Sequence, residues 1–162
     1  HLKKRKIQAM YMNSSIFVSN EQTSNDDILA DLIHEVAHAL EEQMGFEIYS
    51  DNQIESEFIQ KRKKLWTVLK NQGFNIDLEY FLETKYNQKF DHFLYSVVGY
   101  PTLTTLTVNL FFSPYAATSL REYFATGFED FYLEGGQQLK NISPVLYNKI
   151  LNFQKNSEFK RS

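Results

Sequence analysis

The segment His34-Glu35-Val36-Ala37-His38 (HEVAH) restricts what this chain can form more than any other feature. On a helix, His34 and His38 lie one turn apart on the same face, so both imidazoles can reach one metal ion. Glu35 then borders the ion, where the general base for a bound water has to be. Zinc suits imidazole and carboxylate ligands and keeps one position open for catalysis. The segment predicts one catalytic Zn2+ per chain; a purely structural metal, or two ordinary exposed histidines, are the alternatives.

The residues around HEVAH predict an amphipathic helix with a marked beginning and end. Ser24 and Asp27 have the spacing of a capping box, and Gly45 is the expected stop. Between them the apolar residues recur at helical spacing: Ile28, Leu29, Leu32, Ile33, Val36, Ala37, Leu40 and Met44. The β-branched and aromatic run from Ser15 to Ser19 predicts a preceding strand.

Four later segments predict helices. They run from Gln53 to Leu69 with an end near Gly73, from Asp77 to Phe90, from Ser119 to Leu133, and onward from Ser143-Pro144. For the third, Ser119 with Glu122 gives a capping box, and a start at Ser113 with Pro114 in the first turn is the alternative. Gly135-Gly136 is its expected end.

Two further runs predict local structure of other kinds. The Thr-rich run from Tyr100 to Val108 favours a strand or an extended loop. The basic residues Lys61 to Lys64 are expected to form the solvent face of their helix. Together the patterns predict a mainly helical (α+β) single domain over residues 1–162, with a small β-sheet or β-ribbon.

Composition narrows the class of protein. The chain is 43% hydrophobic and 15% aromatic, which is typical of a globular domain. Its net charge of -3 gives no reason to expect a nucleic-acid partner, and the basic run Lys3 to Lys6 predicts a solvated arm. The absence of cysteine excludes disulfides and thiolate metal sites. No apolar run approaches the roughly 18 residues of a membrane span. The start at His1, without a signal-peptide pattern, predicts a domain cut from a longer protein, whose other domains would be partners.

A catalytic zinc needs a third ligand besides the two histidines. Residues 39–45 contain no histidine, and His1 and His92 lie outside any ligand motif. A glutamate from a later helix is therefore expected, and Glu122 is the best candidate, because it opens an amphipathic helix that would pack on the HEVAH helix. The apolar stripe of this helix is Leu120, Phe124, Phe128 and Phe131.

Other carboxylates compete for this role. Glu129 lies two turns after Glu122, and Glu41 and Glu42 follow HEVAH closely. Glu129 is otherwise expected to be solvated, with a bond to a histidine N–H as the alternative. Small residues at Ala125 and Gly127 would let the two helices approach closely.

The block from Ile28 to Glu42, followed by Tyr115 and then Glu122-Tyr123-Phe124-Ala125, resembles the anthrax-lethal-factor-like zinc peptidases. This family includes the secreted Pro-Pro endopeptidases. Its members pair an HExxH helix with a downstream E-[FY]-F-A helix and place a tyrosine seven residues before that glutamate. Tyr115 lies seven residues before Glu122, and the resemblance covers about residues 14–46 and 113–150.

This resemblance implies a zincin-like metallopeptidase domain of the gluzincin type. His34, His38 and Glu122 would bind zinc, Glu35 would act as the base, and Tyr115 would donate a hydrogen bond to the oxyanion. Taken alone, Tyr115 would be a core or rim residue. The segment at about 51–112 is longer than the family's spacer, and we expect a helical insertion there that either sets specificity or only packs. This difference leaves the substrate preference open, including any preference for proline.

The expected function is that of a zinc metalloendopeptidase acting on a protein or peptide substrate without a covalent intermediate. The strand from Ser15 to Val18 would pair with an extended substrate. One alternative is a cytoplasmic regulatory peptidase that cuts a repressor or a neighbouring protein. Another is a catalytically silent zincin-like binding domain of a larger toxin or virion protein, although Glu35 and Tyr115 argue against it. A secreted, toxin or virion setting is slightly favoured over the cytoplasm.

Overall fold

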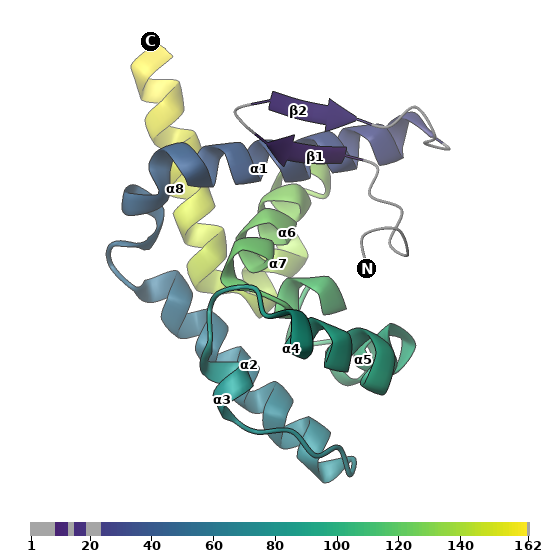
Figure 1. Cartoon of the computed structure of the whole chain (residues 1–162). Helices are drawn as coiled ribbons and strands as arrows, with labels where there is room; N and C mark the ends of the chain where they lie inside the picture. Colours follow the sequence, from purple (N-terminus) through teal and green to yellow (C-terminus); the bar gives the residue numbers. More distant parts are fainter. Residues whose placement is uncertain (1–8, 13–14, 19–23, 162) are drawn as a thin grey trace.

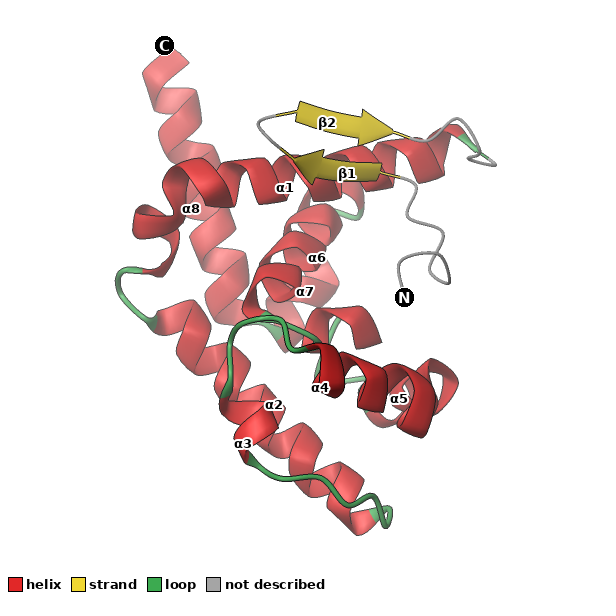
Figure 2. Ribbon diagram, viewed as in Figure 1, coloured by secondary structure: helices red, strands yellow, loops and turns green. Residues whose placement is uncertain are grey.

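The computed structural model describes residues 9–12, 15–18 and 24–161, and within them the chain is mainly helical (Figure 1, Figure 2). This confirms the predicted class, whereas the zincin-like domain stays a prediction. The elements are β1 (Ala9–Met12), β2 (Ser15–Val18), α1 (Asn25–Tyr49), α2 (Gln53–Asn71), α3 (Glu79–Leu82), α4 (Gln88–His92), η2 (Phe93–Gly99), α5 (Tyr100–Leu106), η3 (Pro114–Ala117), α6 (Leu120–Leu133), α7 (Gln137–Ile142) and α8 (Pro144–Arg161). His1, the basic run Lys3 to Lys6, and Ser19 lie outside the described residues. None of the helices in these ranges is long and apolar enough to cross a bilayer.

Strands β1 and β2 pair antiparallel, with Ala9 opposite Val18 and Met12 opposite Ser15. The strand predicted from Ser15 is thus confirmed as β2, and its partner β1 was not anticipated. The pair lies along α1 (Figure 1). Pairing of this strand with a substrate stays a prediction.

Helix α1 begins as its sequence predicts. The Ser24 hydroxyl accepts a hydrogen bond from the Asp27 amide at 3.1 Å, which satisfies one of the free N–H groups of the first turn. The apolar stripe is less buried than expected. Ala37 is fully buried, but the residues nearer the start are 37–47% exposed: Ile28, Leu29, Leu32 and Val36.

The predicted stop of α1 at Gly45 is confirmed only as a kink. Met44 has non-helical dihedral angles (φ -123, ψ 24), so the glycine follows a kink, and the helix continues to Tyr49. Ile48 is fully buried in the last turn, and the Tyr49 ring packs on Phe124 with 6.3 Å between centroids. These contacts outweigh the weak helix propensity of glycine.

Helix α2 carries two charged side chains into the interior, and the prediction that Lys61 to Lys64 face solvent is wrong for two of the four. Lys63 and Lys64 are exposed, but Lys61 and Arg62 are buried. Both lie on the stripe that forms the core face of the helix, whose apolar members are Ile54, Phe58, Leu65 and Leu69.

Burial of these cations is compensated by backbone oxygens. Arg62 Nη1 donates to the Ala117 carbonyl at 2.6 Å, and Nη2 donates to the Tyr80 carbonyl. Its guanidinium also lies 4.0 Å from the centroid of the Phe90 ring, a cation–π contact. Lys61 likewise donates to two backbone carbonyls. Helix α2 is therefore tied to several later segments by bonds from charged side chains.

The single helix predicted from Asp77 to Phe90 is interrupted, because residues 83–87 separate α3 from α4. The Asn87 side chain accepts hydrogen bonds from two amides of α4, which starts a new helix there. The carbonyl of Thr84 accepts the Leu120 amide at 2.8 Å. The interrupting loop thus lies against the start of α6.

The strand or loop predicted from Tyr100 to Val108 is also wrong, since the structure has helix α5 there, after the π-helix η2. Pro101 lies in its first turn, where proline is favoured. The hydroxyls of Thr104, Thr105 and Thr107 each donate to the carbonyl four residues earlier. Threonine can therefore continue this helix despite its preference for strands.

Both helix starts predicted close to Glu122 exist. Ser113 begins the short 3-10 helix η3, its hydroxyl accepting from Ala116 N at 3.4 Å, and Ser119 begins α6.

The close-approach role expected of Gly127 is wrong. A Cβ there would overlap the side chain of Leu146 from α8, so this glycine allows contact between α6 and α8 rather than with α1. One hydrophobic cluster joins residues of α1, α2, α6 and α8, including much of the segment 51–112.

Candidate metal centre

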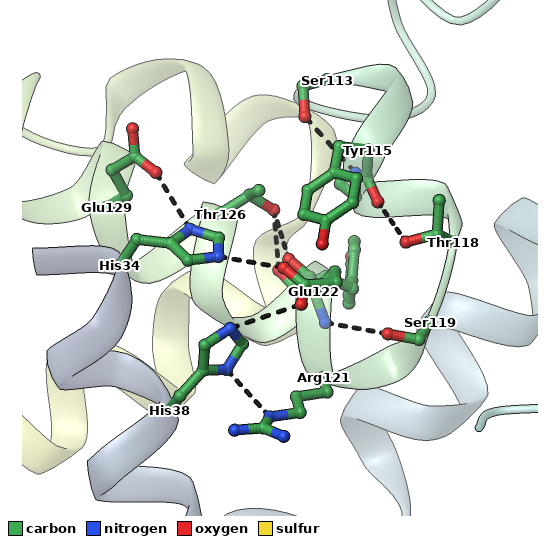
Figure 3. A network of polar contacts seen from close by, with 12 residues as sticks. His34, His38, Ser113, Tyr115, Thr118, Ser119, Arg121, Glu122, Thr126 and Glu129 are labelled. Atoms are coloured by element: carbon green, nitrogen blue, oxygen red, sulfur yellow. Dashed lines mark hydrogen bonds and ion pairs between the residues drawn. The ribbon is translucent and has the colours of Figure 1, made fainter. Parts of the chain in front are cut away.

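Helices α1 and α6 pack against each other and bring three ligand-type side chains together (Figure 3). His34 and His38 come from consecutive turns of α1. Glu122 comes from the first turn of α6, where its amide donates to the Ser119 hydroxyl at 3.2 Å. The cap therefore fixes where α6 begins and which residue of its first turn meets α1.

The donor atoms of the three residues lie close enough together that one metal ion could be held between them. His34 Nε2 lies 2.9 Å from Glu122 Oε2, and His38 Nε2 lies 3.3 Å from Glu122 Oε1. Ligand atoms of tetrahedral zinc lie about 2.0–2.1 Å from the ion, and therefore about 3.3 Å from one another. One ligand atom from each of the three residues lies within 4.8 Å of the others, and no second such trio occurs in the described part of the chain.

The three residues also shift one another's charge states. Burial by itself lowers the pKa of His34, but hydrogen bonds with Glu122 and Glu129 outweigh burial and raise the pKa to about 10. Burial raises the pKa of Glu122, yet the hydrogen bonds from His34 and His38 lower it to about 2. Glu122 is thus an ionised carboxylate over the whole physiological range, which is the form that binds a metal.

Glu35 and Tyr115 lie beside this trio. Glu35 follows His34 on α1 and is 9% exposed. Tyr115 projects from η3, and its ring centroid is 6.5 Å from that of His34. Figure 3 shows its hydroxyl pointing toward the Glu122 carboxylate. All five residues predicted for the site therefore lie in one region of the structure.

The turn that carries Tyr115 is held by its neighbours. Thr118 Oγ1 donates to the Tyr115 carbonyl at 2.7 Å, and Arg62 donates to the carbonyl of Ala117. The Ser113 hydroxyl caps the start of the turn. Pro114 restricts the backbone in its first position. The ring of Tyr115 is thus presented by a short segment with little freedom.

Each histidine has a second neighbour at its other ring nitrogen. His34 Nδ1 lies 3.1 Å from Glu129 Oε2, so the expectation that Glu129 is only solvated is wrong. His38 Nδ1 lies 3.0 Å from Arg121 Nε, and 3.8 Å from Glu41 Oε2. No pattern in the sequence pointed to Arg121. The spacing of three residues between His38 and Glu41 on one helix was a usable signal.

A hollow of about 560 Å³ has one member of the trio, Glu122, in its wall. The wall also includes Glu41 of α1, Arg121 of α6, and Lys85 and Tyr86 of the loop after α3. The loop comes from the segment 51–112. That segment therefore contributes to the wall of the hollow that Glu122 also lines. His92, in contrast, is an exposed residue of α4.

The chain was compared with known proteins at three levels. No protein-family model, no curated protein and no solved structure matches it.

Proposed function

We propose that this chain is a zinc-dependent endopeptidase. The observation that carries the proposal is the trio His34, His38 and Glu122, which offers one ligand atom from each residue, all within 4.8 Å of one another. Two imidazoles and one carboxylate are a ligand set that zinc accepts, and three protein ligands leave the fourth position for a water or substrate. A structural zinc site would be closed by a fourth protein ligand, so the three-residue set favours catalysis.

A zinc ion held by these residues would supply a Lewis acid that lowers the pKa of a water molecule to about 7. Glu35 is the general base in this proposal. It accepts the proton of the attacking water and passes it to the leaving amine. It directly follows His34 on α1 and is only 9% exposed, so its side chain is largely shielded from bulk solvent.

Tyr115 would donate its phenolic hydrogen to the oxyanion that develops on the substrate carbonyl. The orientation of its hydroxyl toward Glu122 and the hydrogen bonds that hold η3 support this role. The hollow lined by Lys85 and Arg121 would receive a substrate residue next to the cleaved bond. Protein or peptide chains are the substrate class, in line with the resemblance to the lethal-factor-like peptidases.

The test is digestion of a peptide library by the zinc-loaded protein, read out by mass spectrometry, with Glu35→Gln and Tyr115→Phe as matched variants. We expect wild type to cleave, Glu35→Gln to lose about 10²- to 10⁴-fold in kcat, and Tyr115→Phe to lose about 10²- to 10³-fold. Both variants should keep one zinc per chain, since neither removes a ligand. A zinc-loaded wild type that cleaves nothing in the library would overturn the peptidase proposal and favour a binding domain.

A further inference from the structure

The two histidines of the trio differ in what faces their outer ring nitrogens. His34 Nδ1 already has a carboxylate at 3.1 Å, Glu129. His38 Nδ1 instead has the Nε of Arg121 at 3.0 Å, while the nearest carboxylate oxygen, Glu41 Oε2, lies at 3.8 Å. Figure 3 shows the Arg121 side chain reaching His38 from α6. The outer nitrogen of His38 therefore meets a cation where that of His34 meets an anion.

The contact between Arg121 and His38 cannot survive metal binding through Nε2. An imidazole that gives Nε2 to a metal carries its hydrogen on Nδ1 and needs an acceptor there. Arginine has five N–H donors and no acceptor. Once Nε2 binds the metal, Arg121 Nε and His38 Nδ1 are two donors facing each other, so one of them has to find another partner.

Glu41 offers that partner. Its Oε1 accepts the Tyr49 hydroxyl at 2.7 Å, whereas its Oε2 is buried and has no hydrogen-bond partner within the described ranges. A buried carboxylate oxygen without a donor is costly. A movement of about 1 Å would bring Oε2 from 3.8 Å to hydrogen-bond distance of His38 Nδ1.

Arg121 is the residue free to move. Its side chain is 54% exposed, against 16% for Glu41, whose other oxygen is held by Tyr49. Arg121 Nε also lies 3.7 Å from Glu41 Oε2. After leaving His38, the guanidinium can therefore stay beside the same carboxylate or extend into the adjoining hollow, whose wall it forms.

We propose that Glu41 is the positioning residue for His38 in the metal-bound protein, and that Arg121 is a latch on His38 that metal binding releases. Glu129 already holds the outer nitrogen of His34 in the orientation that metal binding needs. In His38, the outer nitrogen has to exchange its contact with Arg121 for one with Glu41 before the ring can bind the metal. This inference rests on the metal site of the proposed function and does not depend on peptidase activity.

The test measures zinc affinity by competition with a fluorescent chelator at neutral pH, in wild type and three variants. Glu41→Gln should bind zinc about 10- to 100-fold more weakly, the usual effect of removing a carboxylate that orients a metal-bound histidine. Arg121→Lys keeps the positive charge but places a methylene where Nε lies. It should bind zinc about three- to tenfold more tightly, because one competing hydrogen bond is lost. Glu42→Gln, which removes the same charge from an exposed neighbour, should stay within about twofold of wild type.

Weaker zinc binding in Glu41→Gln but tighter binding in Arg121→Lys separates this proposal from a general loss of structure. Such a loss would weaken zinc binding in every variant. Thermal unfolding of the metal-free variants checks that all of them fold. In a crystal structure of the zinc-loaded protein, His38 Nδ1 should lie within about 3.2 Å of Glu41 Oε2. If Arg121→Lys binds zinc as tightly as wild type or more weakly, the proposed role of Arg121 is wrong, but the metal site itself is not called into question. A folded wild type that binds no zinc overturns both this inference and the proposed function.

Discussion

Glu57 of α2 accepts hydrogen bonds from the start of α8, and a substitution that removes one of them should destabilise the whole domain. Its Oε1 accepts the Tyr123 hydroxyl at 2.6 Å and the Leu146 amide at 3.2 Å, and its Oε2 accepts the Val145 amide at 2.8 Å. Two of these donors are free N–H groups of the first turn of α8, which no residue of that helix can satisfy. Tyr123 is the residue after the candidate ligand Glu122, so one carboxylate joins α2, α6 and α8.

Glu57→Gln is the sharpest substitution, because it keeps the size of the side chain. A glutamine can still accept two of the three hydrogen bonds, but its NH₂ group then faces the Val145 amide as a second donor. Leaving one amide without an acceptor costs about 1–3 kcal/mol. Loss of the negative charge at a helix start costs a further 0.3–1 kcal/mol, roughly. The free energy of unfolding should therefore fall by about 1.3–4 kcal/mol.

The assay is guanidinium chloride unfolding of the metal-free protein, followed by circular dichroism and by the fluorescence of Trp66, the single tryptophan. A loss in the middle of this range would lower Tm by about 5–10 °C for a chain of this length. Glu42→Gln, on the exposed side of α1, is the control for charge removal and should change stability by less than about 0.5 kcal/mol. Equal unfolding midpoints for the two variants would refute the reasoning.

Three further outcomes follow from the same contacts. Glu129→Gln should weaken zinc binding about 10-fold or more, because an amide orients the Nδ1–H of His34 less well than a carboxylate does. Chelator competition measures this, and an unchanged zinc affinity would contradict the prediction. Zinc binding at neutral pH should release at least one proton per ion, since the hydrogen bonds of His34 raise its pKa to about 10 and zinc takes the neutral imidazole. The affinity should consequently fall as the pH falls, and a calorimetric heat that is the same in buffers of different ionisation enthalpy would exclude the release. Gly127→Ala should lower the free energy of unfolding by about 1–3 kcal/mol, because the added methyl overlaps Leu146; an unchanged unfolding midpoint would show that α8 can move away without cost.

Much of the candidate site could be predicted because its signals are local. The spacing of His34 and His38 depends only on the helical repeat, and Ser24 and Ser119 cap the helices that the capping patterns predicted. Glu122 was predicted from its place at the start of an amphipathic helix. Helix periodicity and caps are properties of a few neighbouring residues, so they can be read before the fold is known.

The errors lie where a specific contact outweighs the average preference of a residue type. The run from Tyr100 to Val108 has the composition of a strand, yet its threonine hydroxyls bond back to the helix that they belong to. Gly45 has the propensity of a helix end, but buried contacts of Ile48 continue α1 beyond it. Arg62 was assigned to solvent by its charge, although its position on the stripe of α2 pointed to the core.

The sequence by itself determined that two histidines would share one face of a helix with Glu35 at its border. It also determined that a second helix would open with Glu122, and that Tyr115 would precede Glu122 by seven residues. Only the tertiary structure decided which groups meet across helices. It placed Glu129 on His34 and Arg121 on His38, and it left an oxygen of Glu41 buried nearby without a donor. The physical reason is that periodicity specifies the direction of a side chain around its own helix, whereas the partner of that side chain depends on how two helices cross, which the packing of the whole core decides.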